Sequence, residues 1–300
     1  MKKIKAEFVL ALILVGTFLT TTRIPVGKAA SSTQINDAII AGLDYLNQTQ
    51  AADGHWGGSY YPVACTGMAV LAFENFGHLP GDLADPYHIT VEKGLDYLFT
   101  QAHVQTLTAQ PAGDPDTNGN GIGIYFSASD TIYQTPMVLM AIVASQAPSR
   151  TATTGPANVN GRSYYDITVD IVDWITWAQN EAGNGRGGWR YSPNYGSSDN
   201  SNTQWPLLGL LTAKLWGINA PAWVKTELLM WLTYSQNLAG DYNTNSRYGS
   251  FGYTAPTDIN DVAETATGIL GLTYCDLPKT DPRVVAAQGY IVRDWLTTSS

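Results

Sequence analysis

The chain has 300 residues, of which 44% are hydrophobic and only 14% are charged. This is enough for one large domain, or two small ones, with a full core. The formal net charge is −9, and the Lys and Arg clusters that bind phosphates are absent, which argues against a nucleic-acid partner.

The N-terminus predicts a secretory signal over residues 1–29. A basic start, Met1 to Lys5, precedes an apolar run from Phe8 to Leu19 and then the small residues of Gly27-Lys28-Ala29-Ala30. We therefore expect the remaining domain, residues 30–300, to act outside the cytoplasm. Lys28 beside the expected cleavage site leaves a second interpretation open, in which the segment is retained as a membrane anchor.

Hydrophobic periodicity predicts nine helices, which pair as four and a half helical hairpins. First helices are amphipathic, as in Ile35, Ile39, Leu43 and Leu46, whereas second helices are apolar nearly all round. We therefore expect two layers, with the second helices inside. The expected first helices cover about 35–48, 91–98, 165–181, 222–237 and 282–297, and the second helices cover 61–76, 131–147, 202–216 and 260–275.

One short pattern recurs along the chain: an aromatic–aliphatic pair, a Gln, and a Gly before an aromatic residue. Self-similarity at a period of tens of residues indicates repeated supersecondary units. The three copies are Tyr45-Leu46, Gln50, Gly54 and Trp56; Trp174-Ile175, Gln179, Gly187 and Trp189; and Trp231-Leu232, Gln236, Gly249 and Phe251.

This pattern resembles the QW repeat of squalene–hopene and oxidosqualene cyclases, and it is similar to the helical hairpins of protein prenyltransferase β subunits. The resemblance implies an all-α fold, an α/α toroid with inner and outer helix rings and a cavity at one end. Because only four and a half hairpins are expected, either the toroid is open, or its final helix pairs with another element, or the sequence is a fragment. A second hairpin carries Gly94, Tyr97 and Leu98, but its Gln101 comes one residue early. A polar insertion over residues 106–129 replaces its closing turn.

Class II terpene cyclases carry an Asp-x-Asp-Asp motif whose middle Asp protonates the substrate. Here the matching residues are Asp258-Ile259-Asn260-Asp261, so an amide, which cannot donate an acidic proton, stands at the donor position. Asp258 and Asp261 remain as candidate catalytic acids, because paired carboxylates can raise one pKa. The alternative is that both carboxylates cap a helix.

Candidate lining residues of the central cavity come from the second helices and the turns before them. Four threonines occupy one register, about one turn before each apolar run, and they either support the helix starts or form a polar ring around a hollow. The candidate cavity residues are Thr66, Thr135, Asp199, Thr203, Trp205, Tyr253 and Thr265.

The insertion contains a candidate calcium loop. Asp114, Asp116, Asn118 and Asn120 place oxygen ligands at alternate positions, with Gly119 at the sixth. The acid expected at position twelve is replaced by Tyr125, and a plain solvated loop is the alternative. Prenyltransferase-type zinc is not expected, because no His lies at ligand spacing from Cys65 or Cys275. We expect these two cysteines to be buried free thiols rather than a disulfide.

Two functions remain open at this point. The first is a non-catalytic binding or scaffold module, with a central apolar cavity for a lipid, peptide or glycan. The second is a squalene–hopene-like cyclase or isomerase that uses Asp258 and Asp261 as acid. An unsealed end of the toroid would expose apolar surface, so we also expect a protein partner or self-association there.

Overall fold

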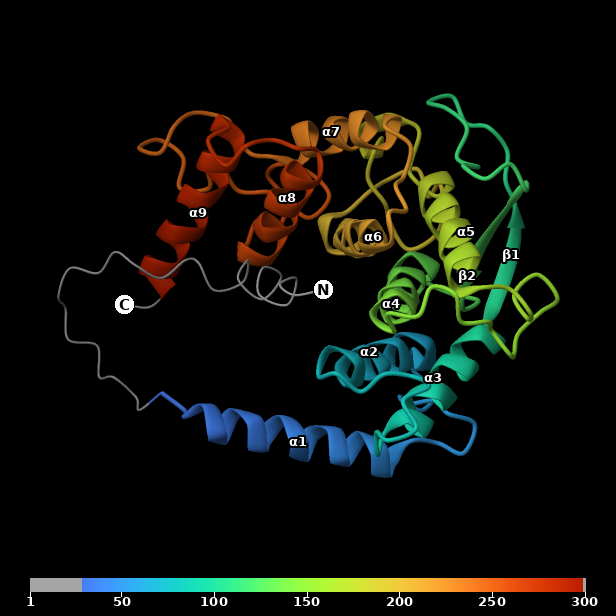
Figure 1. Cartoon of the computed structure of the whole chain (residues 1–300). Helices are drawn as coiled ribbons and strands as arrows, with labels where there is room; N and C mark the ends of the chain where they lie inside the picture. Colours follow the sequence, from blue (N-terminus) through green and yellow to red (C-terminus); the bar gives the residue numbers. More distant parts are fainter. Residues whose placement is uncertain (1–28, 299–300) are drawn as a thin grey trace. The chain divides into compact units, whose positions relative to one another are not determined.

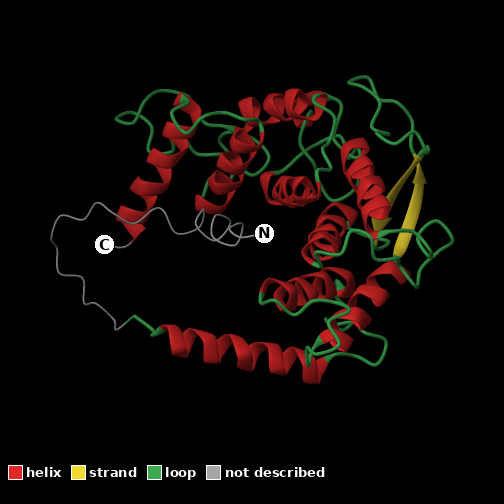
Figure 2. Ribbon diagram, viewed as in Figure 1, coloured by secondary structure: helices red, strands yellow, loops and turns green. Residues whose placement is uncertain are grey.

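The computed structural model describes residues 29–298, which form nine α-helices and one small two-stranded hairpin (Figures 1 and 2). The predicted signal segment lies outside the described residues, apart from Ala29. The elements are α1 (Ser32–Thr49), α2 (Pro62–Asn75), α3 (His88–Thr100), β1 (Ala102–Thr106), β2 (Ile122–Phe126), α4 (Thr131–Ala144), α5 (Tyr164–Trp177), α6 (Asn200–Ala213), α7 (Trp223–Ser235), α8 (Val262–Tyr274) and α9 (Pro282–Thr298).

The expectation of an all-α chain is wrong at the insertion. Strands β1 and β2 pair antiparallel, with Ala102 opposite Phe126 and Thr106 opposite Ile122. Ile124 and Phe126 are fully buried, and β2 packs on α5. The alternating apolar residues of β2 therefore form a half-buried strand inside a segment that otherwise has the composition of a polar loop.

The chain divides into two compact units, Met1–Asp44 and Tyr45–Ser300. The described part of the first unit contains most of α1, where Leu43 is buried but Ile35 and Ile39 are exposed. Among the residues of the predicted apolar face that lie in the first unit, only Leu43 is therefore buried. All the other helices and strands belong to the second unit.

Within the second unit, the second helices of the hairpins form a row. Helix α2 packs on α4, α4 on α6, and α6 on α8, while the first helices α3, α5, α7 and α9 pack against members of this row (Figure 1). In α4 every residue except Tyr133 and Ala144 is buried, which confirms that a helix apolar on all sides is covered on all sides.

Glycines allow the row to pack closely. A Cβ added to Gly67 of α2 would lie 3.2 Å from the carbonyl carbon of Met137 in α4. A Cβ added to Gly209 of α6 would lie 3.1 Å from the Cβ of Pro136, also in α4. Both distances are shorter than ordinary van der Waals contact, so close helix–helix approach accounts for glycines that weaken an isolated helix.

In the first, third and fourth hairpins, the repeated Gln joins the hairpin to the next helix pair or helix. The side-chain amide of Gln179 donates to the carbonyl of Gly187 in its own turn (2.8 Å) and to that of Val224 in α7 (3.2 Å). The other two copies make the same pair of bonds, Gln50 to Gly54 and Thr90, and Gln236 to Gly249 and Arg283.

The turn glycine of each repeat lies against the backbone of the next first helix. Gly187 has a φ of +90°, and a Cβ there would overlap the carbonyl oxygen of Glu227 in α7. Gly54 and Gly249 stand in the same way against Lys93 and Ala286. The pattern recognised in the sequence is therefore the contact between successive hairpins, and only glycine fits both its backbone conformation and its spacing.

Candidate functional site

The four threonines of the second helices are buried structural residues. In each repeat the threonine hydroxyl accepts a hydrogen bond from the backbone N–H of the turn aromatic residue, and each threonine is fully buried. These hydrogen bonds link the turn to the start of the helix, and none of the four side chains lines an open cavity. The pairs are Thr66 with Trp56, Thr135 with Phe126, Thr203 with Trp189, and Thr265 with Phe251, at 3.0–3.2 Å.

Phe126 therefore supplies the turn aromatic of the second hairpin, which the sequence prediction missed. The residue lies at the end of β2, 24 residues after Ala102, its partner in β1, so the insertion separates it from its own repeat. The sequence signal for this role is Thr135, nine residues after Phe126. In every repeat the threonine hydroxyl contacts the turn aromatic residue in this way.

Asp258 does not have the environment of a catalytic acid. Its carboxylate accepts hydrogen bonds from the Thr254 hydroxyl (2.5 Å) and backbone N–H (3.1 Å), and from the Ile259 N–H (2.7 Å). The side-chain hydrogen bond from Thr254, aided by the backbone bonds, holds the pKa of Asp258 below its usual value. The group is thus ionised near neutral pH, whereas a proton donor must be protonated.

Asp261 and Asp199 cap equivalent helices. Asp261 accepts from the backbone N–H of Glu264 at the start of α8 (2.9 Å). Asp199 accepts from the N–H of Asn202 at the start of α6 (2.6 Å). The structure thus places Asp261 and Asp199 in the capping role, whereas Asp258 accepts its hydrogen bonds in the turn before α8. Asn260, which precedes Asp261, donates its amide to the carbonyl of Pro256 (2.9 Å).

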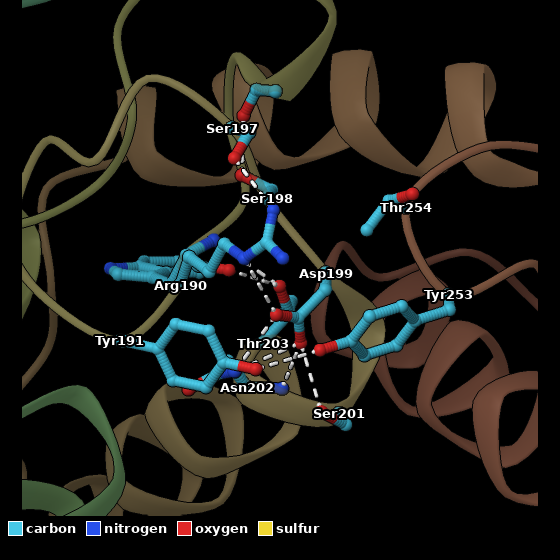
Figure 3. A network of polar contacts seen from close by, with 12 residues as sticks. Arg190, Tyr191, Ser197, Ser198, Asp199, Ser201, Asn202, Thr203, Tyr253 and Thr254 are labelled. Atoms are coloured by element: carbon cyan, nitrogen blue, oxygen red, sulfur yellow. Dashed lines mark hydrogen bonds and ion pairs between the residues drawn. The ribbon is translucent and has the colours of Figure 1, made fainter. Parts of the chain in front are cut away.

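Asp199 is also the centre of a buried polar network (Figure 3). It is fully buried, lies 3.3 Å from the Nε of Arg190, and accepts from the side chains of Ser201 (3.0 Å) and Asn202 (2.9 Å). The pairing with Arg190 compensates a carboxylate that would otherwise be costly to bury. This charge pair fixes the loop before α6 on the first turn of that helix.

Five aromatic side chains gather around this network: Tyr133, Tyr191, Tyr195, Trp205 and Tyr253, here called the aromatic rim. Tyr133 stacks 6.4 Å from Tyr191 and lies 6.0 Å from Trp205, measured between ring centroids. The hydroxyls of Tyr191 and Tyr253 are 2.9 Å apart, and the two rings point them toward each other from either side, next to Asp199 (Figure 3). The rim combines residues of α4 and α6 with residues of the turns before α6 and α8.

A cation already occupies part of the aromatic rim. The guanidinium carbon of Arg190 lies 5.4 Å from the ring centroids of Tyr191 and Tyr195, and 5.9 Å from that of Tyr253. These are cation–π distances. Burial, the hydrogen bond with Tyr191 and the charge of Asp199 raise the pKa of Tyr253 well above its usual value, so this phenol stays protonated and is no general base.

Glu264 is the residue at this site that the sequence prediction missed. It is 8% exposed, and its Oε2 has no hydrogen-bond partner within residues 29–298. Burial, together with the charges of Asp261, Asp199 and Asp258, raises the pKa of Glu264 to about 7. The signal was its position three residues after the cap Asp261, where a Glu in a capping box normally turns back toward the helix start.

Tyr133 is the residue of the rim that α4 contributes. Tyr133 is one of the two residues of α4 that are not buried, and its hydroxyl lies 3.3 Å from that of Ser201. Burial raises the pKa of Tyr133, and the charges of Asp199 and Glu264 raise it further. Tyr133 therefore lies within electrostatic range of both carboxylates, although the three residues come from separate parts of the chain.

Two shallow clefts lie beside the start of α4, and both include Ser129 and Asp130. Their volumes are about 260 and 230 Å³. The surface of the first cleft is mainly polar, whereas that of the second is mainly apolar. The first is lined by Ser59, Tyr60, Tyr61, Pro62, Ser127, Ser129, Asp130 and Gln134, and the second by Gln105, Tyr125, Ala128, Ser129, Asp130, Thr131, Trp174, Ser192 and Pro193.

Two residues of the first cleft have an unusual backbone. Tyr61 and Asp130, the residues before α2 and α4, both have positive φ angles, of 48° and 46°. The Tyr61 hydroxyl donates to Asp130 at 3.0 Å. A left-handed backbone is costly for a bulky residue such as tyrosine, and such strain is concentrated at functional sites.

The polar side chains of the candidate calcium loop form hydrogen bonds within the protein. Asp114 accepts from the N–H of Asp116, and Asp116 from those of Gly119 and Gly121, at 2.7–3.1 Å. Asn118 and Asn120 donate their amides to the buried Asp170 of α5 (2.7 and 2.9 Å). In the described part of the chain no group of three or more His, Cys, Asp or Glu is arranged to hold a metal; calcium binding stays a prediction.

The two cysteines are free thiols, as expected. Cys275 is buried, but Cys65 is exposed, so the expectation that both are buried is wrong for Cys65. Cys65 is the fourth residue of α2 and lies next to Gly57, where an added Cβ would come within 2.6 Å of its sulfur. The close turn thus covers one side of the thiol and leaves the other open.

No protein-family model matches the chain, and no curated protein compared with it is significantly similar in sequence. Across residues 29–298, none of the helices combines the length and the apolar character needed to span a bilayer.

Proposed function

We propose that the protein is an extracytoplasmic binding module built from cyclase-like helical hairpins in an α/α toroid. Its ligand lies over the N-terminal ends of the inner helices α4, α6 and α8. The observation that carries the proposal is the contrast between the regular contacts of the helical hairpins and the lack of a cyclase-type proton donor among residues 258–261. The three Gln contacts between hairpins are complete, whereas Asn260 stands where a cyclase has its acid and the neighbouring Asp258 is held ionised.

The aromatic rim supports a binding role. Its tyrosine and tryptophan side chains offer rigid faces with polar edges, which suit recognition at a surface that is partly apolar and partly wet. Tyr195 is 50% exposed, and Tyr60 in the first cleft is 81% exposed. An exposed aromatic side chain in the first cleft, whose surface is mainly polar, favours a ligand with many hydrogen-bonding groups over a lipid.

The second candidate is a terpene cyclase that uses Asp258 and Asp261. The helix-start position of these residues favours it, because a cyclase carries its acid there. Glu264 does not take over the acid role, since a carboxyl group with a pKa of about 7 is a weaker acid than an ordinary one and protonates an alkene less readily.

The test compares the wild-type protein with the double variant Asp258→Asn, Asp261→Asn, because Asn caps helices about as well as Asp. Both proteins are titrated by calorimetry with soluble oligosaccharides, with short peptides and with squalene in detergent micelles, and the squalene samples are analysed for cyclised products. We expect equal ligand affinity in both proteins and no product in either. A cyclised product that disappears in the variant would replace the binding proposal by the cyclase one.

A further inference from the structure

We propose that the exposed face of α1 is a docking surface for a helical hairpin of the same repeat type, carried by a different protein chain. This partner is additional to the proposed ligand and does not depend on it. The basis is a comparison of α1 with the other first helices, α3, α5, α7 and α9. The joining Gln and Gly contact the same two positions of α3, α7 and α9, and the aromatic–aliphatic pair places α1 and α5 in the same register.

The position of Gly42 is where α1 differs from the other first helices. Gly42 corresponds to Gly94 of α3, because Gly-Leu-Asp-Tyr-Leu occurs in both helices. Gly42 is exposed, and Ile39, one turn earlier, is 36% exposed. The residues that correspond to Gly42 are all buried, and they are Gly94, Ile171, Leu228 and Ala287. Those that correspond to Ile39 are at most 3% exposed in three of the four helices, and they are Val91, Thr168 and Val284.

On α3 this face is covered by the hairpin that precedes it. A Cβ added to Gly94 would lie 2.4 Å from the Cγ2 of Val70 in α2 and 3.2 Å from the ring of Trp56 in the turn. The side-chain amide of Gln50 donates to the carbonyl of Thr90 at 2.9 Å. The element that covers a first helix in this repeat is therefore an inner helix together with its Gly–aromatic turn.

Gly42 itself indicates that a partner approaches α1 just as closely. A Cβ added to Gly42 would meet nothing within 4 Å in the described part of the chain, so the chain's own packing does not require this glycine. A glycine inside an exposed helix weakens it relative to alanine. On α3 the same glycine is necessary, because Val70 and Trp56 leave no room for a side chain. A hairpin that docks on α1 gives Gly42 the same purpose.

A second copy of this chain has no uncovered hairpin of this kind to offer within the described residues. Helix α3 packs on α2, α5 on α4 and α9 on α8, and Gln179 joins the third hairpin to α7. Each repeat contacts only its neighbours, so the open end of an array accepts another repeat or a cap. The occupant is thus a different chain with an uncovered hairpin, whose turn aromatic residue lies over Gly42 and whose Gln donates to the Ala38 carbonyl.

The test extends the protein by one hairpin of its own. In the extended protein residues 1–87 are followed by residues 36–300, so the added hairpin leads into α1 through the segment 76–87, which leads into α3 in the native chain. Asp37→Glu in the added copy gives its peptides a different mass. Hydrogen exchange measured by mass spectrometry then reports the protection of the original α1 in the extended and native proteins.

We expect the amides of the original α1 to exchange more slowly by about tenfold or more in the extended protein. Gly42→Leu in this helix should abolish the protection, because the corresponding position of α3 has no room for a side chain. Ala41→Leu is the matched control and should keep the protection, since the corresponding Lys93 is exposed on α3. In the native chain neither substitution should speed exchange, because Gly42 and Ala41 are both exposed there.

Equal exchange of α1 in the extended and native proteins would overturn the docking surface, and so would protection that persists in Gly42→Leu. Protection of α1 in the native protein that grows with protein concentration would assign the surface to a second copy and overturn the different chain as occupant. The calorimetric test of ligand binding is independent of these outcomes, so either proposal can fail without the other.

Discussion

At the residue scale, Asp258 and Glu264 show how local surroundings set the acidity of a carboxyl group. The two residues are close in sequence, yet their pKa values move in opposite directions. Hydrogen bonds from Thr254 stabilise the charged form of Asp258, whereas burial without a donor destabilises the charged form of Glu264. Within six residues, the chain therefore holds one carboxylate that hydrogen bonds keep ionised and another whose pKa is about 7.

The pH dependence of stability tests the environment of Glu264. Its pKa is about 7 in the folded protein and has a reference value of 4.5, so the folded state holds this proton more tightly. Its contribution to stability is complete below pH 4.5 and is lost as the pH rises through 7. From pH 5 to 8 this group should lower the free energy of unfolding by on the order of 1 kcal/mol, after allowance for solvent screening.

Urea unfolding at pH 5 and pH 8 measures the effect, with Glu264→Gln as the test variant. This variant should lose less stability between the two pH values than the wild type. Some loss should remain, because burial also raises the pKa of Asp173 to about 7 and that group acts in the same direction. An identical pH dependence in the two proteins would show that Glu264 is not buried in an unpaired state.

At the scale of elements, the contact between hairpins depends on one side chain per repeat. Gln179 is 1% exposed and bonds to two carbonyls, one in its own turn and one in α7. Gln101, one residue out of register, instead bonds to the neighbouring Thr100 hydroxyl. A shift of one position on a helix turns a side chain through about 100°, so Gln101 cannot reach the corresponding carbonyls.

Removal of the repeat amide should therefore destabilise the fold in a register-dependent way. Gln179→Ala deletes two hydrogen bonds and leaves the carbonyls of Gly187 and Val224 without this donor, at a cost of about 2 kcal/mol or more. Gln101→Ala should change stability by less than about 0.5 kcal/mol. Denaturant unfolding monitored by circular dichroism compares the two variants, and equal losses would contradict the assigned role of the amide.

At the scale of the whole molecule, α9 presents an apolar surface. Val285, Val292, Trp295 and Leu296 on this helix are between 47% and 68% exposed. Scattered apolar residues on a surface are ordinary, but several on one helix mark an interaction surface. We propose that the expected self-association or partner contact uses this helix.

Sedimentation velocity over a range of protein concentrations tests this expectation. The wild-type protein should associate as its concentration rises, and Val292→Lys with Leu296→Glu should keep it monomeric, because burying these charges in an interface is costly. Leu83→Glu is a matched control, since Leu83 is 83% exposed outside α9. If the wild-type protein stays monomeric at all concentrations, self-association is excluded, and a different protein remains as the partner for the apolar surface of α9.

The sequence by itself determined the helices and the repeat, because both depend on short-range periodicity and local conformational preferences. The expected second helix over 61–76 is observed as Pro62–Asn75, and the one over 260–275 as Val262–Tyr274. The repeated Gln and Gly were recognisable because the same local contact needs the same residue types each time.

Only the tertiary structure decided what the polar residues do. The buried strand β2 owes its place to packing on α5, and the insertion hid its role in the repeat. The four threonines support the turns, and this role was not evident from the sequence because their hydrogen-bond partners lie 9–14 residues away. Glu264 was inconspicuous in the sequence because its acidity depends on burial and on charges brought together by folding, which a linear pattern does not contain.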